Sequence, residues 1–224
     1  MSRRGLPRRI LLAFTALFGA ALAAPEAAAQ PQNRRQEALA RTTIGGTANA
    51  ARCSSAVTGG DVSDGTIRTC TRALERDRLT RSDELRVLLN RGVAHLRRNE
   101  GQLALADFDA ILEQDEDLAE AHLNRGAALV MLGQPAPAVA AITTALSLGV
   151  REPHKAYYNR GAAREALGDI RGAYDDYSTA LEIQPDWGPA EAELLRFVRS
   201  RQERLAQLIG AGGLAGASQV ETQN

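Results

Sequence analysis

Apolar and polar positions follow a helical period through the middle of the chain. In the stretch 157–185, small and apolar residues recur three and four positions apart, for example at Ala173, Tyr177 and Ala180. This spacing puts them on one face of an α-helix. The pair Gly168-Asp169 interrupts the pattern and Pro185 closes it, so the stretch is predicted to form two helices joined by a tight turn.

The triplet Asn-Arg-Gly occurs three times, at 90–92, 124–126 and 159–161, and the same small-residue helix follows it each time. Its glycines are 34 and then 35 residues apart. A period of about this length with two helices per unit is typical of a helical repeat array. We expect the glycine of each triplet to lie where the two helices of a unit approach closely, since only a very small side chain fits there.

These units resemble the tetratricopeptide repeat over roughly residues 85–186, most closely in the third copy. The matching residues are Leu88, Gly92, His95, Ala104, Phe108 and Ile111 in the first copy, and His122, Gly126, Leu129, Gly133, Ala138, Ile142 and Ala145 in the second. Two copies depart from the closing proline, with Glu116 or Gly149 near its place, and Asn99 replaces one turn glycine. The resemblance implies an all-α, TPR-like helical solenoid, an α-α superhelix whose ends need capping.

We expect a signal peptide at 1–29, a disordered segment at 30–49, an N-terminal cap at 50–84, tetratricopeptide repeats at 85–118, 119–153 and 154–187, a capping helix at 188–209, and a disordered tail at 210–224. In the cap, residues 66–74 match a second helix without its first. Trp187 is expected to pack at the joint with the capping helix.

The N-terminus has the pattern of an export signal. A head with four arginines precedes an apolar run at 10–24, which is shorter than the roughly 20 residues of a membrane span. We expect cleavage before Gln30 and a bacterial protein that is periplasmic or secreted, exported by the general or the twin-arginine route. The whole chain is formally neutral, and loss of residues 1–29 makes it mildly acidic, which argues against a nucleic-acid partner.

Cys53 and Cys70 are the only cysteines of the chain. An even count in an exported chain favours a disulfide between them, which would staple the cap, and two free buried thiols are the alternative. The three histidines lie far apart and none has a cysteine at ligand spacing, so we expect no metal site. We also find no phosphate-binding loop or nucleophile motif, and expect no catalytic residues and no cofactor.

The recurring arginines Arg91, Arg125 and Arg160 have a structural and an anion-binding interpretation. Asp107 and Asp176 stand at equivalent places in two second helices, so buried ion pairs are favoured. Ala141 occupies that place in the middle copy, and Arg125 is therefore the candidate for a different partner.

The first helices of such an array line a concave groove, which we expect to be mostly apolar and to bind a peptide or helix. Helical spacing predicts its residues as Arg86, Leu89, Val93, Leu96, Glu120, Leu123, Asn124, Ala127, Val130, Lys155, Tyr158, Asn159, Ala162 and Glu165. A shallow groove, or one filled by the chain's own tails, is the alternative.

The resulting functional hypothesis is a non-catalytic protein–protein interaction module, a scaffold or adaptor of the bacterial cell envelope. The alternatives are an accessory or regulatory subunit of an envelope enzyme and a periplasmic holdase. The partner is expected to be a protein or peptide, with no membrane-spanning segment in the chain after signal cleavage. The sequence does not specify the oligomeric state.

Overall fold

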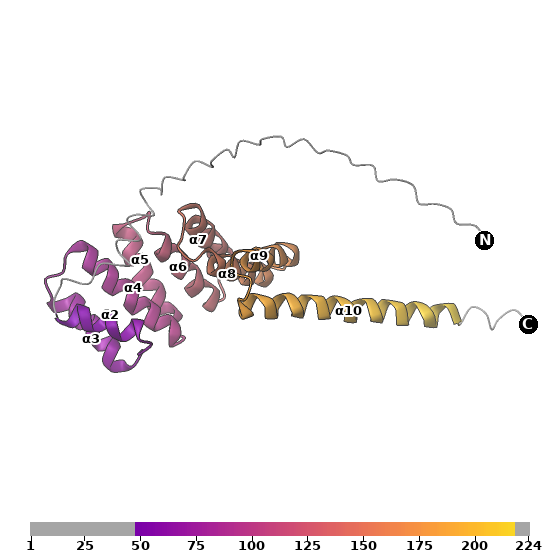
Figure 1. Ribbon diagram of the computed structural model, residues 1–224, viewed down its shortest axis with the longest axis horizontal. Helices are drawn as coiled ribbons and strands as arrows, with labels where there is room; N and C mark the ends of the chain where they lie inside the picture. Colours follow the sequence, from indigo (N-terminus) through magenta and orange to yellow (C-terminus); the bar gives the residue numbers. More distant parts are fainter. Residues whose placement is uncertain (1–47, 218–224) are drawn as a thin grey trace, which may run out of the picture. The chain divides into compact units, whose positions relative to one another are not determined.

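The computed structural model describes residues 48–217 of the chain, and their side chains as far as residue 207. The signal peptide expected at 1–29 and most of the expected disordered segment at 30–49 lie outside these residues. The described helices are α2 (Ala48–Thr58), α3 (Asp64–Arg76), α4 (Arg81–Arg97), α5 (Gly101–Gln114), α6 (Ala119–Met131), α7 (Pro135–Ser147), α8 (Pro153–Ala166), α9 (Ile170–Ile183) and α10 (Gly188–Ala217). They pair in chain order into four hairpins, α2–α3 to α8–α9, followed by α10 (Figure 1).

The turns inside and between the hairpins use residues that tolerate a left-handed backbone. Asn99, Gly133 and Gly168 have φ values of 62°, 69° and 80° and lie two residues after the last residue of α4, α6 and α8. Asn99 therefore replaces the turn glycine as predicted. Gly149, with φ of 78°, ends α7 in the copy that lacks the closing proline. A left-handed glycine thus stops this helix where Pro185 stops its counterpart in the next hairpin.

The three hairpins from α4 to α9 each close on the glycine of their Asn-Arg-Gly triplet. A Cβ atom added to Gly92 would lie 2.6 Å from the Phe108 ring, and one added to Gly161 would lie 2.8 Å from the Tyr177 ring. Ile142 occupies the same place against Gly126. The triplet glycine is therefore required because the largest core residue of the second helix packs directly on its backbone.

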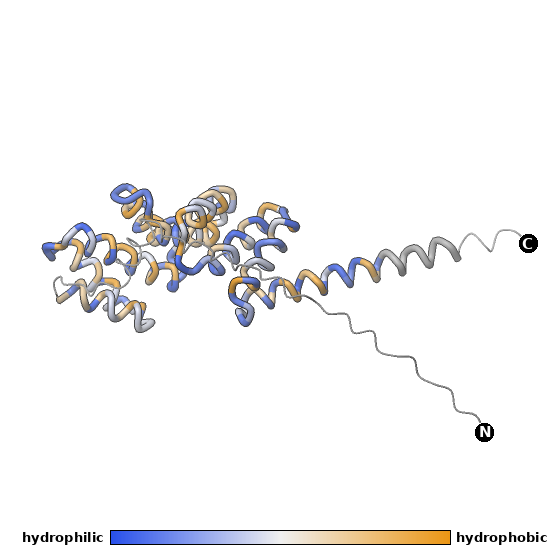
Figure 2. The backbone as a smooth tube through the Cα atoms, turned by 45° about the horizontal axis from the view of Figure 1, so that its top comes forward, coloured by the Kyte–Doolittle hydropathy of each residue, from blue (hydrophilic) through white to orange (hydrophobic). Residues whose placement is uncertain are grey.

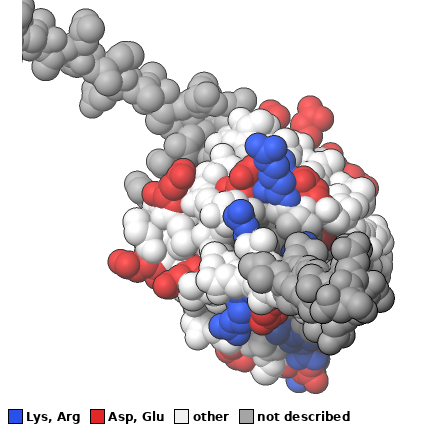
Figure 3. Space-filling model, turned by 90° about the vertical axis from the view of Figure 1, so that its right-hand side faces the viewer, with Lys and Arg blue, Asp and Glu red and all other residues white. Residues whose placement is uncertain are grey.

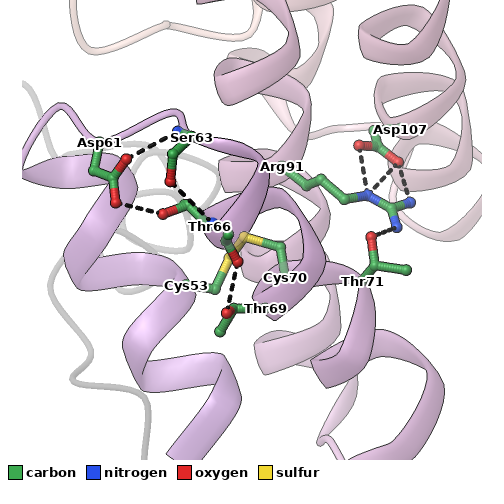
Figure 4. Close-up of a disulfide and its surroundings, with 10 residues drawn as sticks. Cys53, Asp61, Ser63, Thr66, Thr69, Cys70, Thr71, Arg91 and Asp107 are labelled. Atoms are coloured by element: carbon green, nitrogen blue, oxygen red, sulfur yellow. Dashed lines mark hydrogen bonds and ion pairs between the residues drawn. A yellow bond between two sulfur atoms is a disulfide. The ribbon is translucent and has the colours of Figure 1, made fainter.

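The triplet arginines join neighbouring second helices. Arg91 forms a bidentate pair with Asp107, with Nη2 2.6 Å from Oδ1 and Nε 3.0 Å from Oδ2. The Nη1 atom of Arg91 also donates to Thr71 of the preceding hairpin at 3.0 Å (Figure 4). Arg160 repeats this arrangement, donating to Asp176 within its hairpin and to Thr143 of the preceding one. The structural interpretation of these two arginines is confirmed.

Arg125 has a different partner from Arg91 and Arg160. Its Nε atom donates to Asp109 Oδ1 at 2.6 Å, and Asp109 lies on α5 of the preceding hairpin. Asp109 has the register of Thr71 and Thr143, each of which follows the core residue of its helix. In the middle hairpin the carboxylate thus comes from the preceding hairpin and not from the arginine's own hairpin, and the ion pair is kept.

The N-terminal cap is a full hairpin. The expectation that residues 66–74 form a second helix without its first was wrong, because α2 provides that first helix. Cys53 of α2 and Cys70 of α3 form a disulfide and are both fully buried (Figure 4). The Ser63 hydroxyl caps α3 by accepting a hydrogen bond from the Thr66 amide.

At the other end, α10 extends past the capping helix expected at 188–209 and reaches Ala217, where a disordered tail was expected. Its last ten residues contain no proline, and alanine and leucine between their four glycines favour the helix. Trp187 packs at the joint, with its ring centroid 5.0 Å from that of Tyr158. Among the described helices, none combines the length and apolarity that a bilayer crossing requires.

Candidate functional site

A groove with a cavity volume of about 290 Å³ crosses the first helices α4, α6 and α8. Because the hairpins stack in order, these helices lie next to one another and present equivalent positions to the same surface. The lining residues are Leu89, Asn90, Val93, Arg97, Glu120, Leu123, Asn124, Val150, Arg151, Glu152, Lys155 and Asn159. The groove thus draws side chains from three consecutive repeats.

The asparagines of the three triplets, Asn90, Asn124 and Asn159, all line this groove. The arginine that follows each of them points about 100° further around the helix, toward the second helices. Within each triplet the asparagine side chain therefore lines the groove. The arginine side chain connects neighbouring hairpins, and the glycine leaves room for the core residue of the second helix. The groove gains a row of amide side chains, each with donors and an acceptor.

Charged side chains in the groove form ion pairs with one another. Glu120 is only 8% exposed, and its Oε1 atom accepts a hydrogen bond from Arg151 Nε at 2.8 Å. Its second oxygen, Oε2, is buried and has no hydrogen-bond partner among the described residues. Lys155 pairs with Glu152 at 2.7 Å, while Arg97 donates to the carbonyl oxygen of Val57. The groove therefore contains both signs of charge in close alternation.

The expectation of a mostly apolar groove was wrong, since most of its lining residues are polar or charged. The apolar side chains predicted for it are used in packing. Leu96 and Val130 lie half-buried against neighbouring core clusters. Tyr158 packs between Tyr177 and Trp187. The helical period identified the face correctly but could not show how far each side chain reaches into the next hairpin.

Seven of the fourteen residues predicted for the groove line it, namely Leu89, Val93, Glu120, Leu123, Asn124, Lys155 and Asn159. Among the others, Arg86 is buried beside Asp83, and Ala127 and Ala162 are half-buried. Glu165 lies at the α10 joint, where it accepts hydrogen bonds from Arg196 and from the Tyr177 hydroxyl.

Sequence reasoning missed five lining residues: Asn90, Arg97, Val150, Arg151 and Glu152. The repeat itself contained the signal for Asn90, because it has the register of Asn124 and Asn159. Val150, Arg151 and Glu152 lie in the connection between α7 and α8, which has one extra residue compared with the other copies. No periodic pattern predicts where such an insertion points.

The titratable groups outside the groove make local structural contacts. His95 is buried, with Nδ1 2.6 Å from Glu100 Oε2, and His122 Nε2 lies 2.8 Å from the carbonyl oxygen of Glu116. Hydrogen bonds from His95 and Arg98 lower the pKa of Glu100 below its usual value. In the described part of the chain, no three histidine, cysteine or carboxylate side chains converge in a way that could hold a metal ion. On the face drawn in Figure 3, acidic and basic side chains are interspersed and do not form one field of a single sign.

Comparison with known proteins agrees with this architecture. The model of the tetratricopeptide repeat family matches residues 154–186, which span α8 and α9. A crystal structure of the MamA protein is 19% identical to this chain, covers 79% of it and 94% of its own length, and superposes with a TM-score of 0.56.

MamA from Desulfovibrio magneticus RS-1, residues 41 to the end, is 15% identical, with 79% and 99% of the two chains covered and a TM-score of 0.56. The first TPR domain of the human RPAP3 protein is 27% identical, covers 55% of this chain and 95% of its own, and gives a TM-score of 0.49. Together, the nested hairpins and the MamA fold show an all-α, TPR-like helical solenoid, and residues 154–186 of this solenoid match the tetratricopeptide repeat.

Proposed function

We propose that this protein is a non-catalytic interaction module whose groove binds a peptide or helix of a partner protein in the bacterial cell envelope. The observation that carries the proposal is the row of Asn90, Asn124 and Asn159 across three repeats. Side-chain amides in register can bond successive peptide groups of a bound segment, whatever its side chains are. Leu89, Val93 and Val150 supply apolar contact between them.

The envelope setting is supported by two features. The basic head and short apolar run at the N-terminus are typical of an export signal. The buried disulfide between Cys53 and Cys70 suits an oxidising compartment. A holdase or an enzyme subunit would use the same fold, but neither explains why polar side chains should be kept in register along the groove.

The groove is tested by site-specific photocrosslinking of the full chain in bacterial cells. One variant carries a photoreactive amino acid at Arg151, which is exposed in the groove, and a second carries it at Leu103, which is 54% exposed on α5. We expect a defined protein adduct from position 151 only. In the variant Asn124→Ala/Asn159→Ala this adduct should be strongly reduced. The matched control is Gln102→Ala, an exposed amide on α5.

Leu123 is unsuitable for such a test, since it is only 8% exposed and belongs to a core cluster. Equal adducts from both positions, or an adduct that persists unchanged in the double alanine variant, would contradict the groove as the binding site. An adduct with many unrelated proteins would favour a holdase. Export is tested separately, by asking whether removal of residues 1–29 keeps the protein in the cytoplasm.

A further inference from the structure

A second pocket lies at the C-terminal end of the stack, between α9 and α10 and away from the groove. Its cavity volume is about 580 Å³, twice that of the groove. Apolar side chains from both helices line it: Ile170, Tyr174, Phe197, Val198 and Leu205. Four of these five are among the most exposed large apolar residues of the described chain, with 45% to 50% of their surface accessible.

The register of α10 explains why this surface is open. Ala190 of α10 is fully buried and stands one repeat length after Ala156 of α8, which is also fully buried. The helix α10 thus takes the place of the first helix of a further repeat. The turn glycine Gly168 has no counterpart in it, because Gln202 stands there and the helix continues. The described chain provides no second helix to fold back over α9 and α10.

The equivalent surfaces inside the stack are covered. Leu105 and Val139 have the register of Tyr174 in the two preceding hairpins, and both are half-buried against a core cluster formed with the following helices. Tyr174 packs edge-on against the Phe197 ring, at a centroid distance of 6.2 Å. It remains 45% exposed. The pocket is therefore the flank that a further second helix would bury.

Three arginines surround this apolar surface, Arg171 on α9 and Arg201 and Arg204 on α10. All three are exposed, and none forms an ion pair or side-chain hydrogen bond with any described residue. No aspartate or glutamate lines the pocket. In contrast, Arg160 and Arg196 nearby are held by carboxylates of α9 and α8. Positive charge on both sides of an apolar recess favours a ligand that is apolar in the centre and acidic at its edges.

We propose that this pocket docks an amphipathic α-helix of a partner protein, with an apolar stripe flanked by aspartate or glutamate. A ridge of side chains spaced three and four apart fits the channel between two packed helices. The helix would occupy the place of the second helix that the described residues do not provide, and would extend the stack by one element. A bilayer is a poorer occupant, since the apolar side chains line a recess between helices and do not project together from one convex face.

The test measures binding of fluorescent helical peptides of about 20 residues to the full chain. Three matched peptides share one leucine stripe with i, i+3, i+4, i+7 spacing, and their flanking positions are glutamate, glutamine or lysine. We expect the glutamate peptide to bind roughly tenfold more tightly than the lysine peptide at low salt, with the preference shrinking as salt is added.

Charge reversal by Arg171→Glu/Arg201→Glu/Arg204→Glu should invert this preference. The control Arg68→Glu/Arg72→Glu/Arg76→Glu changes the net charge equally through exposed arginines of α3 and should leave it unchanged. Val198→Asp should weaken all three peptides, while Asn124→Ala/Asn159→Ala in the groove should weaken none. Circular dichroism confirms that each variant is folded.

Three outcomes would overturn the proposal. The first is a lack of preference among the peptides, or a preference that the pocket reversal and the α3 reversal change equally. The second is that the chain ignores the glutamate peptide but binds phosphatidylglycerol vesicles through the same arginines, which would make the occupant a membrane. The third is self-association in sedimentation experiments that Val198→Asp abolishes, which would make it a second copy.

Discussion

The two ends of the stack differ in how they are closed. At the N-terminal end, α2 and α3 bury a cluster of small residues, Ala50, Cys53, Val57, Cys70 and Ala73, each at most 2% exposed, and a disulfide joins the two helices. At the C-terminal end, α9 and α10 meet through aromatic rings, and apolar side chains around them stay exposed. Figure 2 shows that hydrophobic and hydrophilic positions alternate along the first turns of α10.

This difference follows from the side chains available at each end. A cluster of alanine, valine and cysteine buries little apolar surface, so a covalent link supplies stability that packing cannot. Tyr177 and Phe197 bury much more area and need no such link, with ring centroids 6.0 Å apart. The price of an end held by packing alone is that its outer flank stays open, and an open flank can accept a partner.

The largest effect is expected at the aromatic end, from Tyr177→Ala. Tyr177 is 1% exposed and packs on Gly161, Tyr158 and Phe197. Removing a buried ring of this size costs about 3–5 kcal/mol of unfolding free energy. Because repeat arrays can unfold in parts, we expect the loss in α8–α10, with faster amide exchange there than in α2–α5.

Hydrogen exchange followed by mass spectrometry locates this effect along the chain. Tyr174→Ala is the matched control, since Tyr174 belongs to the same helix but is 45% exposed, and it should lower stability far less. Uniform acceleration of exchange from α2 to α10 would instead show that the two ends unfold as one unit.

The next largest effect is expected at the covalent end, from Cys53→Ala/Cys70→Ala. The two cysteines are 17 residues apart in sequence, and opening a loop of this length removes about 3 kcal/mol in the chain-entropy model. We expect faster exchange in α2 and α3 and unchanged exchange in α8–α10. Urea unfolding of the unmodified chain with and without a reducing agent should show the same loss of stability. A double-alanine variant that is as stable as the oxidised chain would contradict the prediction.

Much of the fold could be predicted because the determinants are local and periodic. The triplets at 90–92, 124–126 and 159–161 mark three first helices, and the core residues that follow at a fixed spacing mark the second ones. The disulfide could be predicted because the chain offers only one pairing. Even the changed partner of Arg125 was indicated, by the alanine at position 141, although its identity as Asp109 required the relative placement of two hairpins.

The missed features depend on contacts between hairpins. The buried residues of α2, Ala50, Cys53 and Val57, do have helical spacing, but their side chains are small and the apolar pattern they make is weak. The polar lining of the groove was missed because Tyr158 and Val130 have the right register but turn into neighbouring cores. The end of α10 was missed because its four glycines suggested disorder, although the alanines and leucines between them favour a helix.

A smaller effect is expected in the middle of the stack, where Asp109 connects the half nearer the disulfide to the half nearer the aromatic joint. The Arg125–Asp109 pair is partly exposed, with side-chain exposures of 33% and 44%, so Asp109→Ala should cost about 0.5 kcal/mol. Adding Ala141→Asp puts a carboxylate at the position of Asp107 and Asp176, where it can pair with Arg125. Stability measured by urea unfolding should then recover.

Ala141→Asp alone is the control for this pair, because it places a second carboxylate beside an arginine that already has one. Its effect on the free energy of unfolding should be less favourable than the effect of the same substitution in the Asp109→Ala background. If the effects of the two substitutions in this double-mutant cycle are strictly additive, an aspartate at position 141 does not replace Asp109 as the partner of Arg125.

The smallest effect, near zero at neutral pH, is the response of the aromatic end to alkali. Burial, reinforced by the carboxylates of Glu165 and Glu193, raises the pKa of Tyr177 well above its ordinary value of 10.0. The folded state therefore favours the neutral phenol. Its contribution to stability is complete below about pH 10, the pKa of the unfolded chain, and is lost as the pH rises further.

Urea unfolding at about pH 8 and about pH 11 should thus show an alkaline loss of stability that Tyr177→Phe reduces. Tyr158→Phe is the matched control, since burial also raises the pKa of Tyr158, but this residue is half-buried and more of the loss should remain. The cysteines of the opposite end do not titrate while they are joined, so exchange in α2 and α3 should change little over this range. If alkali accelerated amide exchange in α2 and α3 before it did so in α8–α10, the idea that the aromatic end depends on packing alone would be wrong.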